Sequence, residues 1–202
     1  MTQPLQASRF IASAKNVHEL PPSLAEVAFV GRSNVGKSSL LNALTLRKQL
    51  ARVSKTPGRT RLINVFEAAE DRWIVDLPGY GFASGSARER SSWQGMIEGY
   101  LTQRDTLRMV FVLVDAEVGA TRLDHQMLEW LASCDVPFHI VANKADKVSK
   151  SRQEAQHRVV ADSLGRPLEG VAWVSAEKGT GLPELRKAVA DLLGLGTAAR
   201  TR

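Results

Sequence analysis

Short apolar runs alternate along the chain with segments of helical spacing, and this alternation constrains the fold more than any other feature. The strand-like runs are residues 27–30, 62–66, 73–75, 109–114, 138–142 and 171–174. Helical spacing is found at residues 37–46, 87–103, 122–133, 151–164 and 182–193. Continuous apolar runs such as 109–114 are typical of strands covered on both faces. The pattern predicts an α/β fold, a doubly wound, mostly parallel sheet with right-handed crossovers and helices on both faces.

The length of the chain and the position of two prolines indicate a single domain. The chain has 202 residues, and domains typically hold roughly 100 to 200. Pro21 and Pro22 interrupt the chain just before the first predicted core strand. We therefore expect residues 1–22 to form an N-terminal extension, residues 23–194 the core domain, and residues 195–202 a basic C-terminal tail.

Cysteine content and hydropathy exclude several classes of protein. The only cysteine, Cys134, rules out an intramolecular disulfide and a multi-thiolate zinc site, and we expect it to be a small buried side chain near a helix end. A reducing cytosol suits such a chain, so we expect a cytoplasmic protein. The longest apolar runs fall far short of the roughly 20 residues that span a bilayer. We expect no membrane partner and a monomer.

The positive charge is concentrated in the first third of the chain. The net charge of +6 divides into +7 for residues 1–60 and −1 for residues 61–202. The stretch from residue 27 to 66 holds eight basic residues and no acid: Arg32, Lys37, Arg47, Lys48, Arg52, Lys55, Arg59 and Arg61. Such a local field would attract a polyanion, although a merely solvated face is the alternative.

A glycine-rich motif follows the first predicted core strand and opens a predicted helix. Gly31-Arg32-Ser33-Asn34-Val35-Gly36-Lys37-Ser38, followed by Ser39, fits G-x-x-x-x-G-K-[ST]. The glycines allow backbone N–H groups to surround a phosphate, Lys37 can reach the β and γ oxygens, and the Ser38 hydroxyl can ligate Mg²⁺. The motif predicts a phosphate-binding loop.

Three further motifs each follow a predicted strand. Asp76-Leu-Pro-Gly79 places a carboxylate where it can hold a water on Mg²⁺, and the Gly79 N–H where it can reach a γ-phosphate. In Asn143-Lys144-Ala-Asp146, the carboxylate of Asp146 can accept hydrogen bonds from guanine N1–H and its exocyclic amine. The backbone at Ser175-Ala176 offers an N–H to the guanine carbonyl oxygen.

The base motif favours guanine over adenine. Adenine does not present both donors in that arrangement, and a buried carboxylate left unpaired would reject it by up to about 10⁴. Each of the three short motifs has another interpretation, since D-x-x-G is common in turns, Asn143 could cap a helix, and Ser175-Ala176 is nearly uninformative alone. Together, in one order and at one edge of one sheet, they predict binding of GTP and GDP with Mg²⁺.

Several longer strings carry a family resemblance over about residues 9–194. The strings EVAFVGRSNVGKSSLLNAL, VSKTPGRTRLINVF, DLPGYGFA, NKADK and VSAEKGTG resemble the EngB/YihA family, within the TrmE-Era-EngA-YihA-septin group of translation-factor-related GTPases. The resemblance implies a GTPase in which Lys37, Thr60 and Gly79 are catalytic.

The same resemblance places two switch segments. The first spans roughly residues 50–60, with Gly58-Arg59-Thr60 as its motif and Thr60 as a second protein ligand of Mg²⁺ beside Ser38. The residues themselves do not choose between Thr56 and Thr60, and similarity favours Thr60. The second switch spans residue 76 to about 90, and its aromatic residues Tyr80 and Phe82, with Trp93 after them, could contact a partner or pack inside the protein.

Two positions bear on the rate of hydrolysis. Tyr80 stands where many GTPases place a glutamine that orients the attacking water, so we expect slow intrinsic hydrolysis. Asn34 matches the asparagine with which related cation-dependent GTPases hold a potassium ion against the phosphates. The resulting hypothesis is potassium-stimulated turnover; the alternative is that Asn34 is simply a turn residue.

The resemblance also implies a role in assembly of the large ribosomal subunit, with consequences for growth and septation. In the first interpretation, GTP orders the loop carrying Arg52, Lys55, Arg59 and Arg61, and these residues engage ribosomal RNA. In the alternative, the protein regulates a division protein directly, without RNA contact. A nucleoside-phosphate kinase is a weaker third possibility, because no insertion for a phosphate acceptor is visible.

Overall fold

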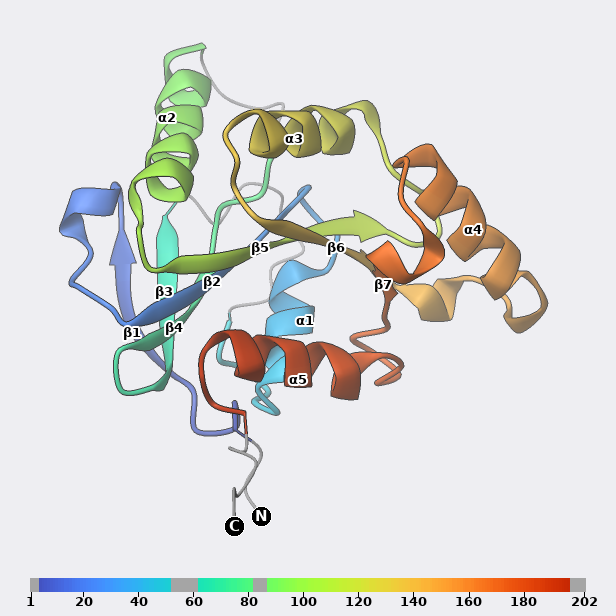
Figure 1. The fold of residues 1–202 in the computed structure, drawn as a ribbon, viewed down its shortest axis with the longest axis horizontal. Coiled ribbons are helices and arrows are strands. Elements are labelled where there is room, and N and C mark those ends of the chain that lie inside the picture. The colour runs from blue at the N-terminus through green and yellow to red at the C-terminus, as the bar shows by residue number, and fades with distance from the viewer. Residues whose placement is uncertain (1–3, 52–61, 82–86, 197–202) are drawn as a thin grey trace.

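The computed structural model describes residues 4–51, 62–81 and 87–196 and consists of one sheet between two layers of helices (Figure 1). The strands are β1 (Arg9–Ala14), β2 (Ala25–Gly31), β3 (Ile63–Ala69), β4 (Arg72–Asp76), β5 (Leu107–Asp115), β6 (Phe138–Asn143) and β7 (Val171–Trp173). The α-helices are α1 (Lys37–Leu44), α2 (Ala87–Gln103), α3 (Arg122–Ser133), α4 (Gln153–Ser163) and α5 (Leu182–Leu192). Short 3₁₀ helices lie at Val17–Glu19, Ala145–Lys147, Lys150–Arg152 and Leu168–Gly170.

The sheet has seven strands in the order β1-β3-β4-β2-β5-β6-β7. Strands β4, β2, β5, β6 and β7 are parallel to one another, whereas β3 is antiparallel to β4 and β1 is antiparallel to β3. The prediction of a doubly wound, mostly parallel sheet is therefore confirmed.

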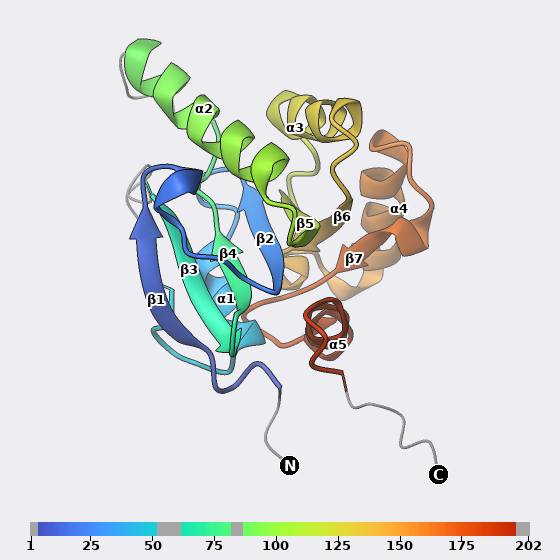
Figure 2. The ribbon, with the colours of Figure 1, turned by 60° about the vertical axis from the view of Figure 1, so that its left-hand side comes forward.

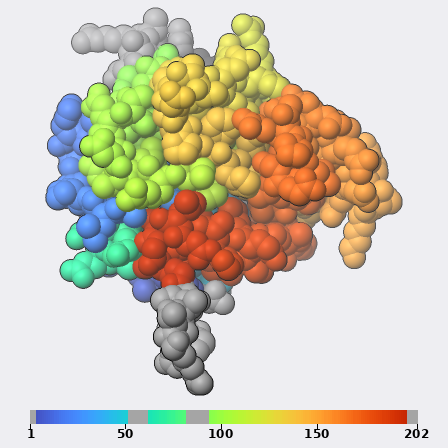
Figure 3. Space-filling view, in the orientation of Figure 1, coloured from blue at the N-terminus to red at the C-terminus, as the bar shows by residue number. Residues whose placement is uncertain are grey.

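Alternate residues of β2 face the two layers, as the period of a strand requires. Val27 and Phe29 pack with α1 and α5, whereas Ala28 and Val30 pack with α2, α3 and α4. Figure 2 shows α2 and α3 on one side of the sheet and α1 and α5 on the other. The space-filling view shows α2 and α3 along the upper part of the molecule and α5 along the lower part (Figure 3). Burial on both faces explains the continuous apolar run of β5.

The stretch 1–22, expected to form an extension, contributes a strand that the sequence patterns did not indicate. In it, β1 pairs with β3 from Arg9 opposite Glu67 to Ala14 opposite Ile63, with an irregularity between Phe10 and Ala12. Leu5 is fully buried in the same cluster as Phe29. These residues therefore belong to the central sheet and its core.

A polar cluster fastens the last turn of α2 to the start of β2. The carboxylate of Glu26 is fully buried and accepts hydrogen bonds from the Tyr100 hydroxyl and from Arg104. Ser23 and Thr106 also donate to it, so its lone pairs are satisfied as a buried charge requires. The Arg104 guanidinium lies 5.3 Å from the centre of the Trp73 ring.

Several aromatic side chains belong to the core or its margin, and the expectation about Cys134 can be checked. Trp73 is buried, while Phe138, His139 and Trp173 are partly buried. The expectation that Cys134 is buried is wrong: it is exposed, because it caps the C-terminal end of α3 where the chain turns at Asp135. Among the described residues, no helix has the length and apolar character needed to cross a membrane.

Candidate nucleotide-binding site

The glycine-rich motif forms the connection from β2 to α1. Gly31 ends β2, Lys37 begins α1, and Asn34 and Gly36 have positive φ angles of 67° and 94°. A Cβ atom on Gly36 would lie 2.5 Å from Nδ2 of Asn143. The loop can therefore approach the strand carrying Asn143 only because this residue is glycine.

Lys37 and Asp76 meet at the carboxyl edge of the sheet. Asp76 ends β4, and its Oδ1 forms a buried ion pair with the Lys37 ammonium at the start of α1. Ser38, the second residue of α1, is partly exposed beside them in the chain. The Ser38 hydroxyl and the Asp76 carboxylate are hard oxygen donors, so this donor set fits Mg²⁺. Thr60, which is expected to ligate Mg²⁺ beside Ser38, lies outside the described residues.

The segment after Asp76 packs on the phosphate loop. The N–H of Leu77 donates to the carbonyl of Phe29 at 3.0 Å, and the N–H of Tyr80 donates to the carbonyl of Gly31 at 3.2 Å. A Cβ on Gly79 would lie 3.1 Å from that same Gly31 oxygen. The backbone of Gly79 is thus held directly against the loop.

Tyr80 points into the protein and not toward a partner. Only 4% of Tyr80 is exposed, and its hydroxyl donates to Oδ1 of Asp124 at 2.6 Å. The other oxygen, Oδ2, lies 3.1 Å from Nε of Arg32 in the phosphate loop. Burial and the Asp124 charge raise the pKa of Tyr80, so the phenol stays protonated and acts as a donor. We call Asp124, Tyr80 and Arg32 the Asp124 cluster.

Sequence patterns did not single out Asp124. The spacing of Thr121 and Asp124 matches an N-terminal capping box, and both reciprocal hydrogen bonds of that box are present at the start of α3. This signal could have predicted the helix start. The contacts to Arg32 and Tyr80 could not have been predicted, because they join residues 44 and more positions apart in the chain.

The base motif lies at the end of β6 and contacts the phosphate loop. Asn143 Nδ2 donates to the carbonyl of Val35 at 3.1 Å, and its Oδ1 accepts from the N–H of Ala176 at 3.2 Å. The Ser175 hydroxyl donates to Oδ1 of Asp146 at 2.6 Å. One amide side chain therefore connects the phosphate loop with the segment that follows β7.

Lys144 is held beside this motif by a neighbouring strand. It adopts a left-handed conformation with φ of 69°, and its ammonium lies 2.8 Å from Oδ2 of Asp115. Asp115 ends β5 and accepts the backbone N–H groups of Glu117 and Val118 through its other oxygen. The ion pair orients Lys144 without occupying the carboxylate of Asp146.

The structure thus brings the four motifs to one edge of the sheet. The remaining predicted positions lie outside the described residues: Thr56, Gly58, Arg59 and Thr60 of the first switch, the basic residues Arg52, Lys55 and Arg61, and Phe82 of the second. The side chain of Trp93 is likewise outside them.

The fold and the site together define a P-loop GTPase. A phosphate loop joins a strand to a helix, an aspartate ends the neighbouring strand, and an asparagine-lysine-x-aspartate motif follows another strand of the same sheet. A family model described as "50S ribosome-binding GTPase" matches residues 26–144. The chain belongs to this family, in its EngB group.

Individual relatives agree with this assignment. The probable GTP-binding protein EngB of Pelotomaculum thermopropionicum is 45% identical over 193 residues, covering 95% of this chain and 98% of that protein. A crystal structure of a probable GTP-binding protein EngB superposes with a TM-score of 0.68 at 25% identity, covering 84% of this chain and 99% of the other. NFeoB from S. thermophilus, bound to GDP·AlF₄⁻ and K⁺, has a TM-score of 0.58 at 27% identity and covers 86% and 64%. As a GTPase of this family, the protein binds GTP and GDP with Mg²⁺ and hydrolyses GTP.

Proposed function

We propose that the protein is a GTP-dependent switch in assembly of the large ribosomal subunit, acting as a cytoplasmic monomer with consequences for growth and septation. The observation that carries the proposal is the match to a family described as 50S ribosome-binding GTPases over residues 26–144. The excess of basic residues between positions 27 and 66 supports it, since a polyanion such as ribosomal RNA would be attracted there. In the described part of this stretch, Arg47 and Lys48 are exposed just after α1.

Within the site, each residue has a proposed task. Lys37 holds the β and γ oxygens, assisted by the backbone N–H groups of the loop, and Asn143, Asp146 and Ala176 recognise guanine. Ser38 and Thr60 would ligate Mg²⁺ and Asp76 would hold a water on it, and the metal would supply positive charge against the phosphates. Gly79 donates its N–H to the γ-phosphate.

Intrinsic hydrolysis is proposed to be slow because Tyr80 cannot orient a water. Tyr80 has no amide, and its hydroxyl is already bound to Asp124. A potassium ion held by Asn34 would supply the missing positive charge. Two observations support this: Asn34 is exposed in the loop, and the related NFeoB structure is bound to both GDP·AlF₄⁻ and K⁺.

The potassium proposal is tested by comparing GTP turnover in KCl and NaCl at equal ionic strength. We expect faster turnover in KCl, and we expect Asn34→Ala to remove the difference. Gln103→Ala, which removes an exposed amide at the end of α2, away from the phosphate loop, serves as a control that should keep it. Equal rates in the two salts would end the proposal.

The ribosomal role is tested by sedimenting the protein with ribosomal particles in GDP and in a non-hydrolysable GTP analogue. We expect co-sedimentation with the analogue, and a steep loss as salt increases. Charge reversal at Arg47 and Lys48, or at Arg52 and Lys55, should weaken it further. The same reversal at the exposed Lys150 and Arg152, outside the basic stretch, provides the matched control.

The alternative function predicts a different result. A regulator that binds a division protein directly would show binding that is insensitive to salt and to RNA removal, and unaffected by the charge reversals. That outcome would overturn the ribosomal proposal while leaving the GTPase assignment intact.

A further inference from the structure

The residue that follows Gly79 is fixed at three points. The N–H of Tyr80 donates to the Gly31 carbonyl, and its carbonyl accepts from the Ser33 N–H at 3.1 Å. The hydroxyl, at the far end of the side chain, is bound by Asp124. Two of these contacts are to the phosphate loop and the third is to α3, so the position of Gly79 depends on both.

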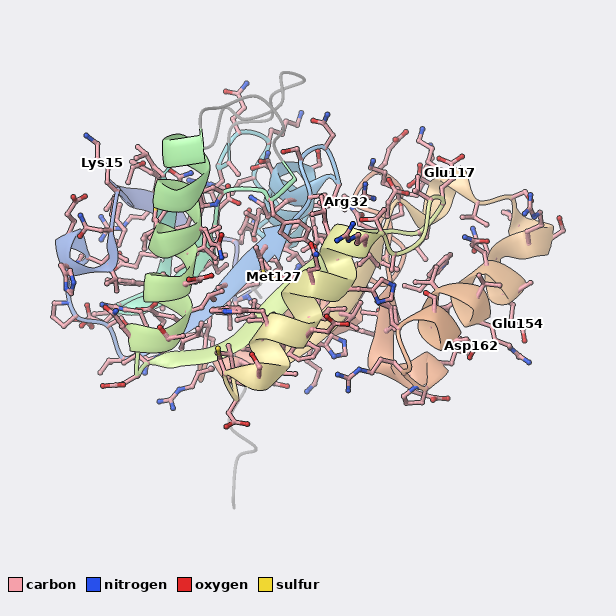
Figure 4. The ribbon with its side chains drawn as sticks, turned by 90° about the horizontal axis from the view of Figure 1, so that it is seen from above. Lys15, Arg32, Glu117, Met127, Glu154 and Asp162 are labelled. Atoms are coloured by element: carbon pink, nitrogen blue, oxygen red, sulfur yellow. The ribbon has the colours of Figure 1, made fainter. Side chains whose placement is uncertain are left out.

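Asp124 has a complete set of partners inside the protein. The residue is fully buried, and its oxygens accept from the Tyr80 hydroxyl, the Thr121 N–H and the Thr121 hydroxyl, the last two at 2.7 Å. Arg32 supplies the compensating charge, and Figure 4 shows it beside the first turn of α3. Hydrogen bonds to a buried, charged acceptor are stronger than neutral ones and restrain their donors tightly.

We infer that Asp124 is a positioning residue for discrimination between GTP and GDP: through Tyr80 it holds the Gly79 N–H against the phosphate loop, ready for a third phosphate. The inference rests on the proposed role of Gly79. GDP has no γ-phosphate, so its affinity depends on Lys37 and the base motif and not on Gly79. Loosening the Asp124 cluster should therefore weaken GTP binding selectively.

A second tyrosine–carboxylate contact in the chain resembles the one between Tyr80 and Asp124. It tests the alternative that the Tyr80 contact only stabilises the core. Tyr100 also donates its hydroxyl to a buried carboxylate, Glu26, which likewise pairs with an arginine, Arg104. That contact lies at the start of β2, at the opposite end of the strand from the phosphate loop. Removing either tyrosine hydroxyl takes one hydrogen bond from a buried carboxylate. Only the hydroxyl of Tyr80 lies beside the nucleotide site.

The experiment compares Tyr80→Phe and Asp124→Asn with Tyr100→Phe in the full-length protein. Dissociation constants are measured calorimetrically for MgGDP and for a non-hydrolysable GTP analogue with Mg²⁺. We expect the first two variants to bind the analogue about tenfold more weakly, as for loss of a hydrogen bond to a charged group, with GDP affinity unchanged within about twofold. Tyr100→Phe should unfold at a lower temperature with an unchanged ratio of the two affinities.

A variant that carries both Tyr80→Phe and Asp124→Asn provides a second test. Because both changes break the same contact, the double variant should lose little more analogue affinity than either single variant. If Asp124→Asn does not fold, Tyr80→Phe alone decides, since it keeps the ring in place. An unchanged affinity ratio, or equal losses for both nucleotides, would overturn the inference. Failure of the unaltered protein to bind either nucleotide would instead overturn the proposed nucleotide site itself.

Discussion

Ser175 determines how the carboxylate of Asp146 is presented. The serine is fully buried, its hydroxyl donates to Asp146, and it accepts the N–H of Lys178 at 2.9 Å. Ser175→Ala should free the carboxylate to turn and leave the Lys178 N–H unpaired. We expect affinities for GDP and for a GTP analogue to fall together by about five- to tenfold, measured by titration. Ser149→Ala, at an exposed serine, should leave both affinities unchanged. If Ser175→Ala changed the affinity for only one of the two nucleotides, this role of Ser175 would be contradicted.

His139 makes stability depend on pH. Burial lowers its pKa in the folded protein, where it packs edge-on against Phe111. Between the folded pKa and the unfolded value of about 6.5, the unfolded chain binds more protons, so the free energy of unfolding falls as pH decreases through this window. We expect urea unfolding at pH 7.5 and pH 5 to show this loss, and His139→Phe to reduce it. The same loss in the variant would refute the assignment.

At the scale of single residues, the sequence predicts roles that depend on local motifs and misses those that depend on distant contacts. Lys37, Asp76 and Asn143 could be singled out because each occupies a fixed place in a short motif after a strand. For Tyr80 the sequence left packing and partner contact open, and only the position of Asp124 on another helix decides between them. Cys134 was misjudged because small size alone does not place a residue inside.

Gly181 immediately precedes α5, in a conformation that only glycine tolerates well. Its φ is 66°, and an added Cβ would lie 2.4 Å from the backbone oxygen of Trp173. Gly181→Ala should therefore cost about 2 to 4 kcal/mol of unfolding free energy through strain and displaced backbone. Gly179 has a φ of +82° and open space around it, so Gly179→Ala should cost only about 1 to 2 kcal/mol. Equal losses in chemical denaturation would contradict this reading.

At the scale of elements, the sequence predicts which helices and strands occur better than it predicts where each one begins and ends. All six strands and all five helices expected from periodicity occur, with ends shifted by local geometry. The helix expected over residues 37–46 ends at Leu44 because Leu46 has a φ of 56°, and that expected from 151 begins at Gln153 after a 3₁₀ turn. Strand β1 was missed because Arg9–Ala14 is an edge strand whose burial is irregular, so it shows no clear alternation.

At the scale of the whole molecule, the first residues complete the sheet. Deleting residues 1–14 removes the buried Leu5 and uncovers the edge of β3. We expect a thermal midpoint lower by about 5 to 15 °C and self-association in light scattering, because an open strand edge pairs readily. Leu5→Ala, which leaves β1 in place, should cost about 2 to 5 kcal/mol without self-association. A deletion variant as stable as the full chain would show that β1 contributes nothing to stability.

The placement of the site follows from architecture and could be predicted. In a parallel sheet with helices on both faces, loops at the carboxyl ends of the strands meet at one edge, and the motifs after β2, β4, β6 and β7 do so here. What could not be predicted is how these loops are fastened to one another. The bonds from Asn143 to Val35 and from Asp124 to Tyr80 depend on side-chain direction in three dimensions.

Helix α2 is held at its last turn, so the helix could pivot about that end. Tyr100 and Arg104 pin that end to Glu26, and the helix extends back to Ala87, within the segment expected to form the second switch. The distance along the helix axis from Tyr100 to Ala87 is about 20 Å at 1.5 Å per residue. A tilt of about 10° would displace the tip by about 3 Å while leaving the pinned end still. A rearrangement of the second switch that tilted α2 would therefore displace its first turns much more than the turn held by Glu26.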